Sequence, residues 1–288
     1  LAPAVETMIA FLRTQIPALP AVRPLSQSAW SADPALRAFF VAPTDVASLL
    51  GQADNLRALF AGSPELDEAY LVLGMAFTEQ RVFGMALQGD VVQRDVAQTS
   101  VSFSDHRTRI CDRDEALLRR AIGVQVFEHL VGHALAQIGE ERSERQELQG
   151  NRSLIRARLR LLQQHGPGLG SMFGEAPAAA AEQSRLEAEL LENERQLAAI
   201  GGGESALQAE LECLQNVLAK PQACLRIEPQ QLRLSPMNVV LGPGGSEPAA
   251  EVDFAVATLS GTPPMRRAFV LARVARSELP APRQINFA

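Results

Sequence analysis

The sequence predicts an α+β protein in which a long helical coiled-coil insertion interrupts an antiparallel β-barrel or sheet. Short stretches rich in Val and Phe, typical of strands, stand on both sides of about a hundred residues with helical character. Neither strand-rich flank is clearly large enough to bury a full core alone, so we expect both flanks to share one sheet. The predicted regions are an N-terminal helical region at 1–68, a β-meander at 69–112, the helical insertion at 113–220 and a second β half at 221–288.

Composition and charge argue against several function classes. The chain has 288 residues and a net charge of −6, which does not favour a general nucleic-acid binder. No run of about 18 apolar residues occurs, so we expect no membrane span. The first residues lack the basic start and long apolar core of a signal peptide. Cys111, Cys213 and Cys224 are odd in number and show no metal-ligand spacing. They fit a reducing compartment, and we expect a cytoplasmic protein.

The two flanks contain recognisable strands and helix starts. Residues 4–15 predict a short helix with one apolar face, and Thr44 or Asp45 is the expected cap of another. The segments EAYLVLGMAF, RVFGMALQGDVVQ and AQTSVSF read as three strands of a meander, separated by TEQR and GD. After the insertion, strands are expected in CLRIEPQQLRLSP, MNVVLG, EVDFAVATL and MRRAFVLARVARSEL.

The helical insertion contains two arms. Asp112 or Asp114 can cap the first arm, and 165–177 holds the glycines and prolines of a break before the second arm at 178–218. The expected apolar positions of the first arm are Val124, Phe127, Val131, Ala134 and Ile138, followed by Leu148, Ile155, Leu159 and Leu162.

The second arm carries a heptad pattern. Its seam predicts a coiled coil within or between chains, whereas an ordinary amphipathic helix packed on its own domain is the alternative. Asn193, the polar residue in the seam, either fixes the register or marks where the seam frays. The predicted oligomerisation residues are Leu186, Leu190, Asn193, Leu197, Ile200, Leu207, Leu211, Leu214 and Leu218.

Charge and glycine content give two further expectations for the arms. Residues 178–219 hold eight Glu and two Arg, a net charge of −6, whereas 107–165 holds eleven Arg and eight acidic residues, a net charge of +3. The arms can therefore pack on each other through flanking ion pairs. Gly201, Gly202 and Gly203 fall outside the seam positions. They form either a thin waist in one long helix or a hinge between two helices.

Two clusters offer chemistry, each with a plainer alternative. Asp105, His106 and Cys111 form a possible Cys–His hydrolase set, or a charged junction between a strand and a helix. His129 and His133 stand four apart on a helix, a spacing that suits a metal, but no third ligand is evident. We therefore predict no catalytic, cofactor-binding or metal-binding residue, and no enzyme activity.

One resemblance to a known family begins at Cys224. The segments LRIEPQQLRLSP, GPGGSEPAAEVDFAV, RRAFVLARVARSEL and RQINFA resemble the second half of a bacterial PilZ domain, over about 65 residues. The β–helix–β plan is similar to that of xanthomonad PilZ-like proteins, in which long helices interrupt the barrel and a heptad-bearing helix assembles four subunits. The resemblance implies a tetrameric regulatory protein of cyclic di-GMP signalling, with another signalling protein as a possible partner.

The sequence departs from the ligand-binding members of that family. Those members combine an R-x-x-x-R arm with a D/N-x-S-x-x-G turn, and none of the turn's signature residues occurs in 226–231. Arg109 with Arg113, and Arg156 with Arg160, have the arginine spacing alone. The prediction is a non-enzymatic, self-assembling PilZ-like regulator with weak or absent cyclic di-GMP binding. The alternatives are a direct cyclic di-GMP receptor using noncanonical arginines, and a metal-dependent or Cys/His hydrolase.

Overall fold

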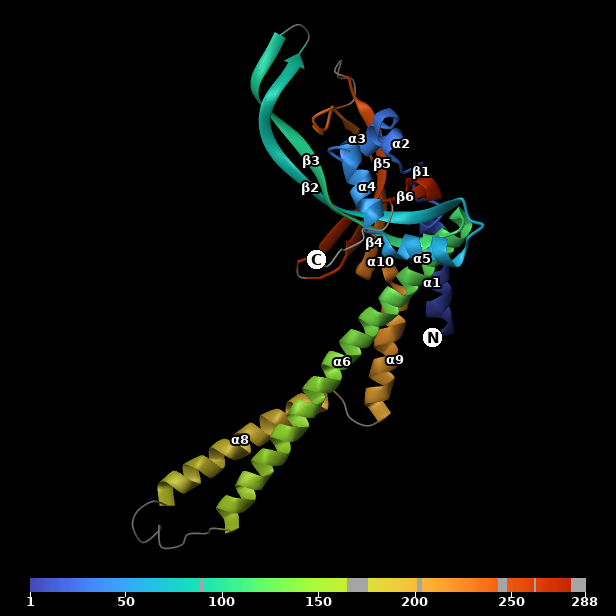
Figure 1. Cartoon of the computed structure of the whole chain (residues 1–288). Helices are drawn as coiled ribbons and strands as arrows, with labels where there is room; N and C mark the ends of the chain where they lie inside the picture. The colour runs from blue at the N-terminus through green and yellow to red at the C-terminus, as the bar shows by residue number, and fades with distance from the viewer. Residues whose placement is uncertain (89–90, 165–175, 201–203, 243–247, 262, 281–288) are drawn as a thin grey trace, which may run out of the picture. The chain divides into compact units, whose positions relative to one another are not determined.

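The computed structural model in Figure 1 describes residues 1–88, 91–164, 176–200, 204–242, 248–261 and 263–280. The chain divides into two compact units, each described separately. The helical unit comprises Leu1–Glu6 and His129–Ala219. The β unit comprises Thr7–Glu128 and Lys220–Ala288.

The β unit is built on one curled sheet to which both flanks of the helical segment contribute. Its path has the order β3-β2-β6-β5-β4, and each pair along it is antiparallel. β2 and β6 pair from Glu68↔Ala275 to Ala76↔Arg267, so strands from before and after the helices meet as expected. The strands are β2 (Glu68–Gln88), β3 (Val91–Asp112), β4 (Leu225–Leu234), β5 (Ala250–Leu259) and β6 (Met265–Ala275).

A short strand and a linking segment complete the sheet. β1 (Arg23–Pro24) pairs in parallel with β6. The segment 238–241, expected as a strand, makes isolated bridges to both edge strands. Val240 N–H donates to Thr99 O of β3 at 2.8 Å, and Leu241 N–H donates to Arg233 O of β4 at 2.8 Å. The sheet therefore curls far enough for one segment to link its two edges.

The expected three-stranded meander is instead one long hairpin. β2 and β3 pair from Tyr70↔Asp112 to Gln88↔Val91, with register shifts at bulges. TEQR, expected as a break, lies inside β2, because none of its residues is a strong turn former and the pairing continues through it. The GD pair at 89–90 lies outside the described residues.

Helices cover one face of the sheet and form the main core with it. Leu36, Phe39, Leu50 and Leu56 of these helices are buried against sheet residues such as Phe254. Aromatic rings meet edge to face at the centre, with the Phe39 and Phe103 centroids 4.8 Å apart. The N-terminal helices are α1 (Ala2–Gln15), α2 (Gln27–Ala32), α3 (Pro34–Phe39), α4 (Pro43–Gly51) and α5 (Asp54–Gly62).

The expected cap of α4 is misplaced by two to three residues. Ala42 is the N-cap, and Asp45 lies in the first turn, where its Oδ2 accepts a hydrogen bond from Ala42 N–H at 2.9 Å. Pro43 follows the cap directly, and its fixed φ suits the first helical position. The helix therefore begins one residue before Thr44.

A single helix, α6 (Glu115–Gln164), forms the whole first arm. Asp114 caps it as expected, because its Oδ1 accepts a hydrogen bond from Leu117 N–H at 2.7 Å. Of the expected inward positions, Val124 is 48% exposed and therefore wrong, whereas Phe127 and Val131 are half-buried beside the fully buried line. The helix has two rows of apolar residues with helical spacing, and contact with neighbouring elements decides which row is buried. The buried line consists of Leu118, Ile122, Val126, Leu130, Ala134 and Ile138.

The second arm consists of separate helices. They are α8 (Ala176–Ile200) and α9 (Glu204–Ala219). The short α10 (Pro221–Cys224) follows them in the β unit. Gly201, Gly202 and Gly203, on which the waist and hinge alternatives depend, lie outside the described residues. None of the helices within the described ranges is long and apolar enough to cross a membrane.

Candidate functional site

The first half of the predicted heptad seam faces α6 of the same chain. Leu186 forms a buried cluster with Ile155 and Leu159, and Leu162 and Leu190 pack against it. The shielded residues of each helix alternate in steps of three and four, which is the spacing of a coiled coil. On α8 they are Gln183, Leu186, Leu190, Asn193, Leu197 and Ile200, with Glu194 also half-buried next to Asn193; on α6 they are Arg145, Leu148, Arg152, Ile155, Leu159 and Leu162.

Ion pairs between α6 and the second arm fulfil the expectation from charge. Arg156 Nη2 lies 2.6 Å from Glu194 Oε1. Arg142 donates two hydrogen bonds to Glu210, at 2.7 and 2.6 Å. The pair nearer the start of α6, at Arg142, uses the later residue of the second arm, Glu210, and the pair further along α6, at Arg156, uses the earlier residue, Glu194. The two arms therefore run antiparallel. Such exposed pairs contribute little stability and mainly select the partner helix.

The second half of the predicted seam is rotated away from α6. In α9 the shielded residues include Ala206 and Cys213, each one position before a predicted seam leucine. Cys213 Sγ lies 3.5 Å from Gln137 Oε1 of α6. Leu207 is consequently 69% exposed and Leu211 39% exposed. Leu214 is half-buried and Leu218 is buried.

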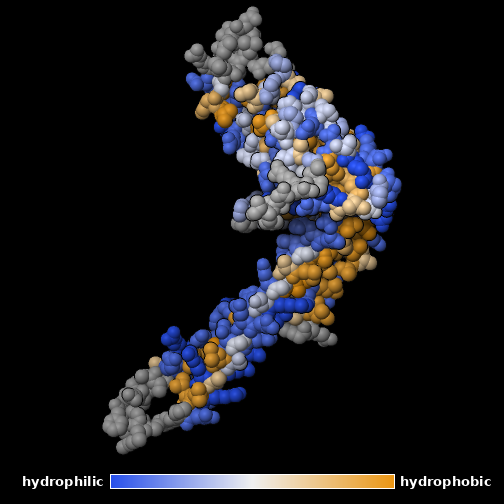
Figure 2. Space-filling model, viewed as in Figure 1, coloured by the Kyte–Doolittle hydropathy of each residue, from blue (hydrophilic) through white to orange (hydrophobic). Residues whose placement is uncertain are grey.

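Apolar side chains therefore remain at the surface of the helical unit. Figure 2 shows them gathered over α9. Sequence reasoning placed these leucines in the seam and did not predict that α8 and α9 would turn different faces to α6. The exposed large residues of this unit's helices from His129 onward are Leu135, Leu154, Leu161, Leu191, Leu207 and Leu211.

Asn193 is a buried polar residue within the α6–α8 seam. It is 6% exposed, and its Oδ1 has no hydrogen-bond partner among the described residues. An amide oxygen buried in this way destabilises the seam by about 1–3 kcal/mol. Burial favours the interpretation that Asn193 is part of the seam over the interpretation that the seam frays there.

The possible hydrolase residues are not brought together. His106 Nε2 is 2.8 Å from Phe39 O, and its ring stacks on Phe40. Asp105 instead holds Arg107 and Arg267. Asp105 has a φ of 47° and lies with His106 at a register shift of the β2–β3 pairing, so a bulge, and not regular strand alternation, directs these two side chains.

Three pKa shifts describe the surroundings of these groups. The hydrogen bond from Arg107 is the main cause that lowers the pKa of Asp105. Burial lowers the pKa of His106, so the neutral imidazole is favoured. Burial raises the pKa of the Cys111 thiol. A thiol with a raised pKa is a poor nucleophile, because the thiolate is the reactive form.

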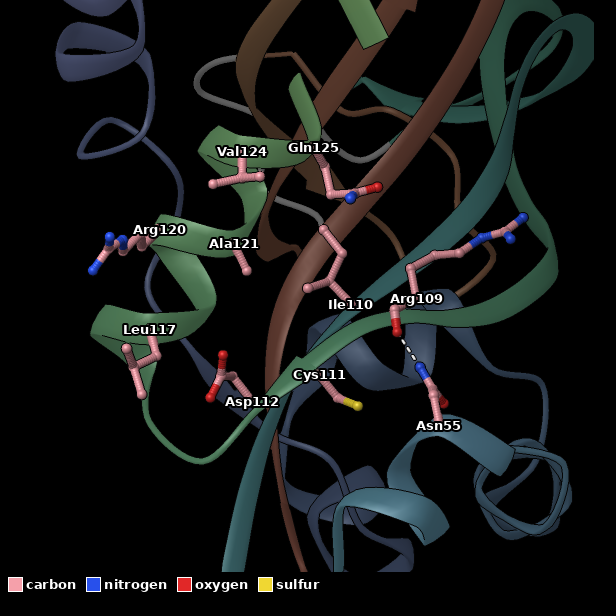
Figure 3. Close-up of a pocket in the computed structure, with 10 residues that line it drawn as sticks. All are labelled: Asn55, Arg109, Ile110, Cys111, Asp112, Leu117, Arg120, Ala121, Val124 and Gln125. Carbon is pink, nitrogen blue, oxygen red and sulfur yellow. Dashed lines mark hydrogen bonds between the residues drawn. The ribbon is translucent and has the colours of Figure 1, made fainter. Parts of the chain in front are cut away.

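An open pocket of about 580 Å³ lies between the end of β3 and the first turns of α6 (Figure 3). Ile110, Ala121 and Gln125 face it, whereas the guanidinium groups of Arg109 and Arg120 point away from it. Asn55 of α5 donates a hydrogen bond to Arg109 O at its edge. Nine of the ten residues that line it lie within 109–125, where β3 passes into α6, and Asn55 comes from α5. Which of these side chains enclose a pocket depends on how the two elements fold back on each other, which no local pattern predicts.

The remaining candidates lie apart on α6 or its approach. His133 Nε2 is 3.3 Å from Gln137 Nε2, and His129 is exposed. Among the residues that the structure describes, no group of three His, Cys, Asp or Glu side chains is placed to hold a metal. Arg156 is engaged with Glu194, and Arg113 follows the end of β3.

No protein-family model, curated protein or solved structure matches the chain.

Proposed function

We propose that the chain is a non-enzymatic regulatory protein that assembles with copies of itself through its helical unit. The observation that carries this proposal is the exposure of leucines in α9 and of Leu135 and Leu191, although the helices already share an inner seam. Contiguous apolar surface on a folded unit is typical of an interaction site. No other part of the described chain packs over these leucine side chains.

The curled sheet is proposed to act as a degenerate PilZ domain in cyclic di-GMP-linked signalling, with another signalling protein as partner. Support comes from the described strands after the helices, because β4, β5 and β6 follow in the order expected from the resemblance. The closing segment expected at 283–288 lies outside the described residues. β4 runs without interruption through 226–231, where ligand-binding members have their turn. Pro229 pairs with Ala255 inside that strand. A strand there leaves no loop to admit a dinucleotide, which favours weak or absent binding.

The separation of Asp105, His106 and Cys111 favours the non-enzymatic proposal over the hydrolase alternative. A nucleophile and its base need to be within hydrogen-bond reach. His106 is instead engaged with a backbone carbonyl, and the Cys111 thiol is kept protonated.

Solution mass and titration calorimetry test the proposal. We expect light scattering on the full chain to give a mass of several chains, with a tetramer expected from the resemblance. Calorimetry with cyclic di-GMP is expected to give no saturable heat at micromolar protein. A single-chain mass at high protein concentration would overturn the assembly, whereas saturable binding would replace the proposed role with that of a direct receptor.

A further inference from the structure

The helical unit has a second face beside its inner seam, which we call the outer face. In two antiparallel helices, residues that directly follow seam-facing residues lie on the same side of the pair, because both the rotation sense and the inward direction are reversed. By this rule Leu135, after buried Ala134, lies on the same side as Leu207, after buried Ala206. By the same rule the outer face holds Leu135, Gly139, Arg160, Glu187, Leu191, Leu207, Leu211 and Leu214, together with the ion pair between Arg156 and Glu194.

Four of the exposed leucines lie on the outer face. They are Leu135, Leu191, Leu207 and Leu211, with exposures between 39% and 71%. Leu154 and Leu161 precede seam-facing residues, so they lie on the opposite side. The apolar surface is therefore distributed unevenly, and most of it belongs to one face.

Beside this ridge of leucines, Gly139 leaves a place without a side chain, which we call the depression. Gly139 follows buried Ile138 on α6, and a side chain added at Gly139 would meet nothing within 4 Å. A glycine inside a helix costs about 1 kcal/mol relative to alanine, and packing within the chain does not require it. Gln137 of α6 contacts Cys213 of α9. Gly139 lies two residues after Gln137, and Leu211 lies two residues before Cys213, which is the same direction along the antiparallel helices. The depression and the leucine therefore lie at the same height on neighbouring helices.

The outer face also carries two opposite charges, one on each helix. Arg160 follows Leu159 on α6, and Glu187 follows Leu186 on α8. The register that pairs Arg156 with Glu194 places Arg160 opposite Leu190, so Arg160 and Glu187 are offset by about three residues, or about 4.5 Å, along the helices, a distance that their long side chains can span. No ion pair of either residue occurs within the described parts of the chain. Glu187 accepts only a hydrogen bond from Gln183, at 2.8 Å.

We infer that the outer face binds the outer face of a second copy, around a two-fold axis parallel to the helices. This inference rests on the proposed self-assembly and specifies where it occurs. A half turn about such an axis places α6 of one copy over α8 and α9 of the other without changing heights. Leu211 then faces the depression at Gly139, and Glu187 lies within side-chain reach of Arg160. The face is thus complementary to itself in shape and in charge, which favours a second copy over an unrelated partner.

A glycine substitution separates association from stability. We expect Gly139→Gln to stabilise the helix, because its side chain meets open space within the chain. The same side chain would overfill the contact with a second copy and raise the dissociation constant about tenfold or more. Gly150→Gln is the matched control: its position is equally open, but it follows exposed Gln149 and lies off the outer face. Sedimentation velocity over a dilution series of the full chain measures the dissociation constants of both variants, and thermal unfolding measures their stability.

Charge reversal tests the two-fold arrangement itself. Arg160→Glu and Glu187→Arg should each raise the dissociation constant about two- to fivefold, as expected for an exposed ion pair, and the double reversal should restore it. Failure of the double reversal to restore association would overturn the arrangement.

The outcomes distinguish this inference from the broader proposal. A wild-type chain that stays monomeric would refute self-assembly and the outer-face contact together. An assembly that is indifferent to Gly139→Gln and to both charge reversals would leave self-assembly standing and refute the outer face. A tetramer whose mass is halved by Gly139→Gln would support the inference and indicate a second contact, for which Leu154 and Leu161 lie on the opposite side.

Discussion

Replacing Asn193 by leucine should stabilise the helical unit. The side chain is 6% exposed, and its Oδ1 has no partner within the described residues. Removing an unpaired buried acceptor recovers about 1–3 kcal/mol. Leucine has a similar size and the shape preferred at neighbouring seam positions, so overpacking should be small. We therefore expect Asn193→Leu to raise the free energy of unfolding by about 1–3 kcal/mol.

Thermal unfolding followed by far-UV circular dichroism is a suitable assay, because helices dominate that signal. A gain of 1 kcal/mol raises the midpoint by about 4–8 °C for a unit of 60–100 residues. Asn216→Leu is the control, since Asn216 is exposed on α9 and gains only helix propensity. A destabilised Asn193→Leu protein would refute the reasoning, because it would show that the amide makes a favourable hydrogen bond in solution.

Three other predictions concern particular contacts. Burial lowers the pKa of His106 in the folded state. The contribution of the neutral imidazole to the β unit's stability should therefore be complete above pH about 6.5 and decline as pH falls through the lower, folded pKa. His106→Gln should flatten that decline when urea unfolding is measured over a range of pH, and an unchanged profile would contradict the prediction. Phe254→Ala removes a fully buried ring from the aromatic core and should cost about 3–5 kcal/mol in the same assay; a cost below about 1 kcal/mol would show that the core is not packed around this ring. Arg142→Ala breaks the pair between an exposed arginine and Glu210, whose side chain is only 13% exposed; because the arginine keeps its contact with water, a double-mutant cycle with Glu210→Ala should give a small coupling that decreases with added salt, and a large coupling that is independent of salt would contradict this.

Local pattern predicted much of the helical unit. The steps of three and four in α8 depend only on nearby residues, so the seam from Leu186 to Ile200 could be inferred from sequence, as could the charge pairing with α6. The same pattern continued through Leu207 and Leu211, but these side chains face outward. Periodicity gives the apolar stripe of each helix and not the direction from which its neighbour approaches.

The β unit shows the same division between local and long-range information. Strand-forming residues were evident on both flanks, and core size indicated that the flanks share a sheet. The join between β2 and β6 confirms this. The number of strands was not predicted correctly, because the polar segment at 78–81 looked like a break, whereas pairing with β3 continues across it. The pocket beside Asn55 depends on three separate elements and could not be predicted.

The pairing of β2 with β6 has a consequence for synthesis on the ribosome. Leu73 and Val270 are partners, so roughly two hundred residues are made between them. The seam of the helical unit needs only residues that emerge before β4, and we expect it to fold while the sheet is still incomplete. β2 meanwhile offers a strand edge that only the last strand covers. A chain that stops before Met265 would therefore carry a formed helical unit and an open, aggregation-prone strand edge, so the nascent chain is most vulnerable in the period before β6 emerges.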